Sequence, residues 1–112
     1  MKLYKIEDMR GGWYCGDFSP SCLKTKDVEV AFKTYDKGDR DIAHYHNVAT
    51  EVTLITKGAA LFNFIRLKEI HLLRKGDIVL IEPGEVVGFS AIEDTETVCV
   101  KLPSVLGDKY IV

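Results

Sequence analysis

The chain alternates short runs of apolar and β-branched residues with Gly, Asp and Pro, which is the pattern of strands joined by turns. In the first run, Val28, Val30 and Phe32 fall on one face of a strand, and Glu29 and Lys33 fall on the other. We expect eight such strands, at residues 28–35, 42–46, 51–56, 60–65, 69–73, 78–84, 86–92 and 96–102. No helical periodicity persists for long enough to support a helix of usual length.

Eight short strands at even spacing predict an all-β sandwich or barrel that closes on itself and so removes exposed strand edges. A chain of 112 residues forms one domain with a single core. Its regular part spans about residues 28–102, between an N-terminal arm (1–27) and a C-terminal tail (103–112). We expect the arm to cover the barrel or to dock on a second subunit, with Trp13 as an interface anchor. The tail packs on the outside or crosses to a partner.

Composition places the chain among soluble globular proteins, with 46% hydrophobic and 29% charged residues. Its net charge of −2, with both signs interspersed, offers no basic stripe to nucleic acid. Cys15, Cys22 and Cys99 are odd in number and lack CxxC spacing, so we expect reduced thiols in a cytoplasmic protein. The start of the chain lacks the apolar segment of a signal peptide, and no apolar run is long enough to span a membrane.

Residues 44–51 (HYHNVATE) are the clearest candidate for chemistry. On a strand, Ile42, His44 and His46 share one face, so the two imidazoles project together. Glu51 follows a four-residue break, which is long enough to bring its carboxylate back beside them. Two histidines and one carboxylate suit Fe(II) and tolerate Mn, Ni, Co or Zn, with open positions for a substrate or dioxygen. The alternative is a polar strand face that binds nothing.

The spacing around these residues resembles the first motif of the cupin superfamily, G-x5-H-x-H-x3,4-E-x6-G. Gly38, His44, His46, Glu51 and Gly58 match it without any adjusted gap. The resemblance spans about residues 28–102 and implies a small single-domain β-barrel of the jelly-roll type, in agreement with the strand pattern. The chain is also similar to a subgroup of small stand-alone cupins with no assigned reaction, which share its W-x2-G-D-F start, I-E-P-G-E second motif and K-L-P-S end.

The second cupin motif, G-x5-P-x-G-x2-H-x3-N, is similar to residues 75–90 (KGDIVLIEPGEVVGFS) when the two are aligned on Gly84. In metal-binding cupins this motif supplies the last histidine ligand, and that position holds Val87 here. Ala91 stands where the motif has asparagine. The resemblance therefore implies a metal site that is one ligand short.

Three outcomes follow for this site. His44, His46 and Glu51 hold a divalent metal ion (Fe, Mn, Ni or Zn) with water completing the shell. Another residue stands in for the lost ligand, and the candidate is His71, the remaining histidine. Or the metal site has lapsed, and the histidines bind an organic ligand directly.

Residues around the candidate site are expected to line a small-molecule pocket. Thr53 and Ile55 share a strand face with Glu51, Phe62 points inward from the following strand, and Val87 lies opposite. These side chains could instead simply fill a small barrel. No cluster of Arg or Lys maps to the inward faces, so a phosphorylated ligand lacks an obvious clamp.

The function expected from this resemblance is binding of, or action on, a small polar metabolite such as a sugar derivative, with a divalent metal in the barrel lumen. One alternative is a non-haem Fe(II) dioxygenase, and another is a ligand-binding or sensor module without catalysis. Whether the protein is an enzyme stays open. The expected partners are a small molecule and a second copy of the chain in a homodimer, with no nucleic acid and no membrane.

Overall fold

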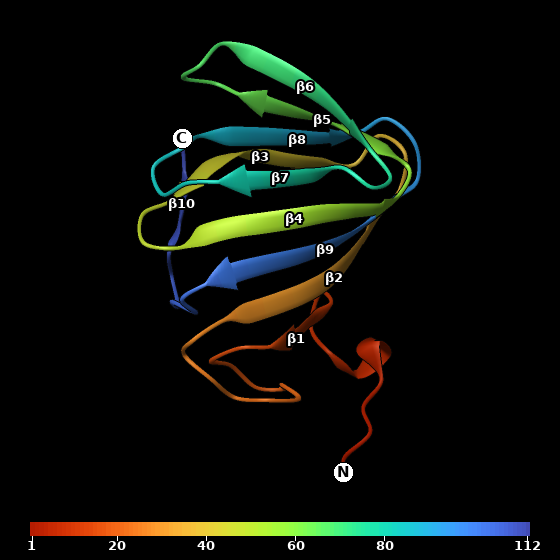
Figure 1. Ribbon diagram of the computed structural model, residues 1–112, viewed down its shortest axis with the longest axis vertical. Coiled ribbons are helices and arrows are strands. Elements are labelled where there is room, and N and C mark those ends of the chain that lie inside the picture. Colours follow the sequence, from red (N-terminus) through yellow and green to blue (C-terminus); the bar gives the residue numbers. More distant parts are fainter.

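Two five-stranded antiparallel sheets face each other in the computed structural model, which describes residues 1–112 (Figure 1). One sheet has the order β1-β2-β9-β4-β7 and the other has the order β10-β3-β8-β5-β6. The strands are β1 (Trp13–Cys15), β2 (Glu29–Tyr35), β3 (Arg40–His46), β4 (Thr50–Lys57), β5 (Ala59–Phe64), β6 (Glu69–Arg74), β7 (Ile78–Ile81), β8 (Val87–Ala91), β9 (Thr95–Leu102) and β10 (Lys109–Ile111). The one helical element is a 3-10 turn, η1 (Ile6–Asp8). The chain has no helix with the length and apolar character needed to cross a membrane.

The all-β jelly-roll fold expected from the sequence is confirmed, and all eight expected strands are present as β2 to β9. β7 ends at Ile81, earlier than expected, because Pro83 cannot donate a hydrogen bond to a neighbouring strand. The sequence did not predict β1 and β10, since three residues are too few to show alternation. Both strands add to the sheet edges, so the regular structure extends into the arm and the tail. The two sheets stay separate hydrogen-bonded units rather than one continuous cylinder.

The glycines at the two ends of the first motif lie in turns that need their conformation. Gly38 and Gly58 have φ angles of +94° and +83°, which side chains rarely tolerate. A β-carbon on Gly58 would also collide with the backbone oxygen of Asp94. The first motif therefore requires glycine at its ends for reasons of folding, independent of any ligand.

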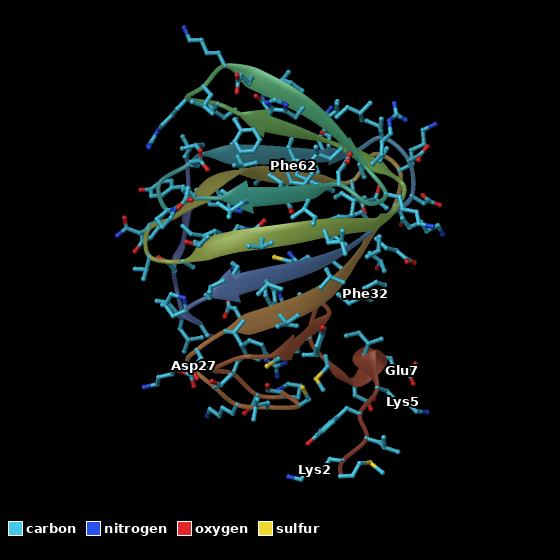
Figure 2. All side chains as sticks on the ribbon, in the orientation of Figure 1. Lys2, Lys5, Glu7, Asp27, Phe32 and Phe62 are labelled. Carbon is cyan, nitrogen blue, oxygen red and sulfur yellow. The ribbon has the colours of Figure 1, made fainter.

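Apolar side chains fill the end of the sandwich where β4 finishes and β5 begins. Ile55 and Ala60 are completely buried there. Phe89 packs edge-on against Phe62 with a centroid distance of 5.2 Å, and its ring lies tilted against that of Tyr35 at a centroid distance of 4.4 Å. The side chain of Phe62 lies between the two sheets (Figure 2). Each large buried side chain stabilises the fold by about 2 kcal/mol, so this cluster holds the two sheets together.

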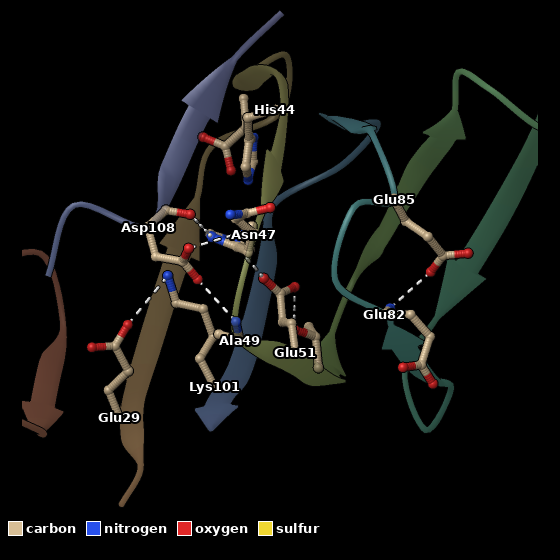
Figure 3. A network of polar contacts seen from close by, with 12 residues as sticks. Glu29, His44, Asn47, Ala49, Glu51, Glu82, Glu85, Lys101 and Asp108 are labelled. Carbon is tan, nitrogen blue, oxygen red and sulfur yellow. Dashed lines mark hydrogen bonds and ion pairs between the residues drawn. The ribbon is translucent and has the colours of Figure 1, made fainter. Parts of the chain in front are cut away.

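The C-terminal tail closes the opposite end by pairing with the chain's own sheet. β10 runs antiparallel to β3, with Lys109 opposite His46. The carboxylate of Asp108 accepts hydrogen bonds from the backbone N–H groups of Asn47, Val48 and Ala49, at 2.9–3.1 Å (Figure 3). Burial raises the pKa of Asp108, but these backbone hydrogen bonds outweigh it and lower the pKa. The tail therefore fixes the loop that joins the two candidate histidines to Glu51.

Candidate functional site

A cavity of about 430 Å³ opens between the two sheets, and Phe62, Val87 and Phe89 of the apolar cluster form part of its lining. β2, β3, β4, β8 and β9 supply its walls, while the N-terminal arm and the C-terminal tail border it. His44, His46 and Glu51 all line it, so the structure brings the three residues of the predicted site into one cavity.

A β-bulge in β3 sets which side chains of that strand face the cavity. The pairing of β3 with β8 shifts between Asp41 and His44, and both of these residues line the cavity. Ile42, which we expected on the same face as the histidines, is instead 67% exposed. A bulge inserts a residue that breaks the period-two pattern, so simple alternation gave the wrong side for Ile42.

Backbone carbonyls orient both imidazoles. His44 Nδ1 lies 2.8 Å from the carbonyl oxygen of Ile42, and His46 Nδ1 lies 3.0 Å from that of Asp108. Because a carbonyl only accepts, each Nδ1 carries the proton and donates it. In the neutral rings each Nε2 is then left with a lone pair. Burial is the main reason that the pKa of His44 is lowered, which favours its neutral form.

Glu51 is mostly buried and is held in its ionised form. Thr53 Oγ1 donates a hydrogen bond to its carboxylate at 2.9 Å, and His46 Nε2 lies 3.7 Å from its other oxygen. Burial raises the pKa of Glu51, but the nearby imidazole of His46, the hydrogen bond from Thr53 and the charge of Lys101 together outweigh it and lower the pKa. A carboxylate therefore faces the imidazole of His46 across the cavity wall.

The facing atoms of His46 and Glu51 leave a gap in which a ligand group or an ion could bind. At 3.7 Å it is longer than a direct N–H···O hydrogen bond. In the neutral tautomer that the carbonyl of Asp108 selects, both facing atoms are acceptors. Two acceptors are stabilised by a donor or a positive charge placed between them, such as the hydroxyl of a ligand, a proton or a cation.

The side chains do not fit a complete metal centre as they stand. No group of three His, Cys, Asp or Glu side chains lies close enough together to hold a metal ion. Val87 is the direct cross-strand neighbour of His44 and is buried against the cavity. The position beside the histidines that the second motif would fill with an imidazole therefore presents an apolar branch.

His71, the candidate for a replacement ligand, is not brought to the site. It lies on β6, where its ring is exposed and its Nε2 is 3.4 Å from Glu69. The ring packs edge-on against Phe64, at a centroid distance of 5.8 Å. It does not line the cavity, so it serves as a surface residue of the β5–β6 hairpin.

The predicted pocket lining is partly as expected. Thr53, Phe62 and Val87 line the cavity. Ile55 does not line it, because it lies one step further along β4 and is completely buried in the apolar cluster. Ile55 does share the inward face of β4 with Glu51 and Thr53, but the cavity ends before it reaches Ile55.

Charged residues of β2 and β9 also line the cavity, and the sequence prediction missed them. Glu29 and Lys33 flank the fully buried Ala31 on the inward face of β2, and Lys101 points inward from β9. The expectation that no cluster of lysines maps to the inward faces is therefore wrong, because Lys33 and Lys101 both line the cavity. The more apolar face of β2, with Phe32, points outward, so hydrophobicity alone selected the wrong face.

Glu29, Lys101 and Glu51 form one row across the sheet, because Lys101 pairs directly with both glutamates. Lys101 Nζ lies 3.3 Å from Glu29 Oε1, and Ser104 Oγ donates to the other oxygen of Glu29 at 2.8 Å. Figure 3 shows this row beside His44. The candidate histidines thus belong to a larger polar wall of alternating charge.

Trp13 borders the cavity. Its ring centroid lies 5.2 Å from Lys33 Nζ and 4.8 Å from Lys101 Nζ, within cation–π range. Phe18 packs edge-on against the indole at 6.4 Å and also lines the cavity. The WYCGDF stretch of the arm therefore forms one side of the cavity mouth.

Comparison with known proteins gives one family match and several similar solved structures. The model of the family described as AraC-like ligand binding domain matches residues 26–105. A search of curated proteins gave no match. Among solved structures, an uncharacterised conserved protein with a double-stranded β-helix domain from Klebsiella pneumoniae has a TM-score of 0.74 at 20% identity, with 100% of this chain and 97% of that chain covered. A cupin-like protein from Thermotoga maritima has a TM-score of 0.69 at 22% identity, with 78% of this chain and 65% of that chain covered. KdgF from Halomonas sp. has a TM-score of 0.67 at 21% identity, with 72% of this chain and 74% of that chain covered.

Proposed function

Because the chain belongs to the family of AraC-like ligand-binding domains, a cupin-type fold, we propose that it binds a small polar metabolite, such as a sugar derivative, between its two sheets. The observation that carries this proposal is the open gap between His46 Nε2 and Glu51, which lines a cavity of about 430 Å³. A cavity of this size suits a small molecule.

Each part of the cavity has a role in this proposal. The Nε2 atoms of His44 and His46 and the carboxylate of Glu51 accept hydrogen bonds from ligand hydroxyls. Phe62 and Phe89 supply apolar surface behind them. A hydroxyl between His46 and Glu51 would donate to one of the two acceptors and relieve their unfavourable approach. Binding alone, without a reaction, is sufficient to account for this geometry.

A divalent metal ion (Fe, Mn, Ni or Zn) is a second candidate for the same gap. It is supported by the two Nε2 lone pairs and the ionised Glu51 that line one cavity. Without the imidazole that Val87 replaces, the remaining donor set is two histidines and one carboxylate, so the non-haem Fe(II) dioxygenase alternative depends on the same three residues.

A homodimer is also part of the proposal. Ile78 and Leu80 on the outer face of β7 are 66% and 53% exposed, and they pair with Leu54 and Val52 of β4. A sheet face of roughly 20 by 25 Å, about 500 Å² in area, supplies more than half of the roughly 800 Å² that each partner buries in a standard interface. Light scattering that gives the mass of a single chain would contradict the dimer.

Thermal unfolding with a panel of small polar metabolites tests the binding proposal. Panel members include neutral sugars, sugar acids, amino acids and nucleosides, each at up to 20 mM. A ligand at 100 times its dissociation constant should stabilise the protein by about 2.7 kcal/mol, which raises the Tm by on the order of 10 °C.

The variant Glu51→Gln distinguishes cavity binding from surface binding, because it keeps the size of the side chain and removes its charge. We expect it to reduce the Tm shift, while Glu69→Gln on exposed β6 leaves the shift unchanged. A panel without any stabilising compound, or equal shifts in the Glu51→Gln variant and the wild type, would sink the proposal.

A further inference from the structure

The carboxylates of the cavity all have donors within the protein. Five carboxylates line it: Glu29, Asp41, Glu51, Glu85 and Asp108. Lys101 and Ser104 donate to Glu29, and Thr53 donates to Glu51. The remaining three accept from Tyr35 and from backbone N–H groups of Glu82 and the 47–49 loop. Every carboxylate of the cavity is therefore hydrogen-bonded within the protein, and Glu29 is also ion-paired with Lys101.

Most of the cationic side chains in the cavity lack a carboxylate partner. Four cationic side chains line it, namely Arg10, Lys33, Lys101 and Lys109, and only Lys101 has a carboxylate within 4 Å. Arg10 and Lys109 are exposed, so water solvates them. Lys33 is partly buried and has no carboxylate partner, which leaves its ammonium group as the unneutralised charge inside the cavity.

The position of Lys33 is fixed by packing. It lies on the inward face of β2, two residues from Ala31, which is completely buried. Trp13 is the cross-strand partner of Ala31, and a residue as small as alanine leaves room for the indole above it. The indole then borders the ammonium groups of Lys33 and Lys101 at 5.2 and 4.8 Å. A cation–π contact orients an ammonium group but carries no negative charge to neutralise it.

We propose that the ligand is a small hydroxylated organic anion, whose charged group binds Lys33 beside Trp13 while its hydroxyls face His44, His46 and Glu51. This inference rests on the proposed function and adds the charge of the ligand to it. The partly buried ammonium group supplies a charge-assisted hydrogen bond to that anion. A carboxylate fits better than a phosphate ester, because one unpaired lysine matches a single negative charge.

Isothermal titration with three matched probes, glucuronate, glucose and glucose 6-phosphate, tests this. The three share a hydroxylated six-carbon sugar and differ in its charged group. We expect glucuronate to bind wild-type protein about 10- to 100-fold more tightly than glucose, the size of one charge-assisted hydrogen bond. Lys33→Met should abolish this preference. Lys37→Met, at an exposed turn after β2, should retain it. Far-ultraviolet circular dichroism and urea unfolding establish that both variants are folded.

The outcomes separate this inference from the proposed function. Equal affinity for glucose and glucuronate, or a Lys33→Met variant with the wild-type preference, overturns the anion site and leaves small-molecule binding intact. Tighter binding of glucose 6-phosphate that Lys33→Met abolishes supports the anion site and assigns it to a phosphate ester. If neither charged probe binds at 20 mM, the inference falls, and the metabolite panel decides the proposed function separately.

Discussion

Replacing Val87 with histidine should raise the affinity of the protein for Zn²⁺ by about a hundredfold. Val87 lines the cavity as the cross-strand neighbour of His44, so a new imidazole would project beside His44 and His46. Loss of an outer-shell partner alone typically costs 10- to 100-fold in metal affinity, and a whole ligand should have an effect at the upper end of that range. The added ring completes the three-histidine, one-carboxylate set together with Glu51.

Titration calorimetry with Zn²⁺ measures this gain, and Val112→His, at the exposed chain end, is the matched control. The control adds the same imidazole outside the cavity and should bind Zn²⁺ no better than the wild type. A Val87→His variant that gains nothing over this control would contradict the alignment of the second motif. A wild-type protein that already binds Zn²⁺ tightly would show that Val87 does not weaken the site.

Removing the carboxylate of Glu29 should destabilise the fold by about 3 kcal/mol. The ion pair of Glu29 and Lys101 is largely buried, with side chains 12% and 14% exposed. Glu29→Ala leaves the ammonium group of Lys101 without its partner, and it also removes the acceptor for Ser104. An uncompensated buried charge costs more than the net contribution of the pair itself.

Urea unfolding at neutral pH measures the change in the free energy of unfolding. The double variant Glu29→Met with Lys101→Met should recover most of the loss, because it removes both charges and keeps comparable volume. Glu69→Ala, at the surface, should change stability by less than about 0.5 kcal/mol. If Glu29→Ala costs no more than Glu69→Ala, the buried ion pair does not contribute as described.

The sequence predicted most of the fold, because strand alternation and turn residues are local signals. Gly38 and Gly58 marked turns that need positive φ, and the HxH spacing placed His44 and His46 on one strand. The spacing to Glu51 brought its carboxylate into the same cavity. These features depend only on residues close together in the chain, which explains why a single sequence sufficed.

Features that depend on distant segments were missed. The bulge that turns Ile42 outward arises from the pairing of β3 with β8, some forty residues later in the chain. The aromatic neighbour of Lys33 inside the cavity is Trp13, which comes from the arm. Asp108 orients His46 from the tail, at a distance of 62 residues. None of these contacts produces a hydrophobic periodicity or a motif spacing that can be recognised in the sequence.

The central claim is that ligand binds between the two sheets at His44 and His46. A long-range ¹H–¹⁵N spectrum of the three histidines, recorded during titration with a stabilising compound from the metabolite panel, tests it most directly. We predict the Nδ1–H tautomer for His44 and His46, and a shift of their Nε2 signals on saturation, while exposed His71 stays unchanged as an internal control. Saturable binding that leaves the signals of His44 and His46 unmoved would contradict the claim.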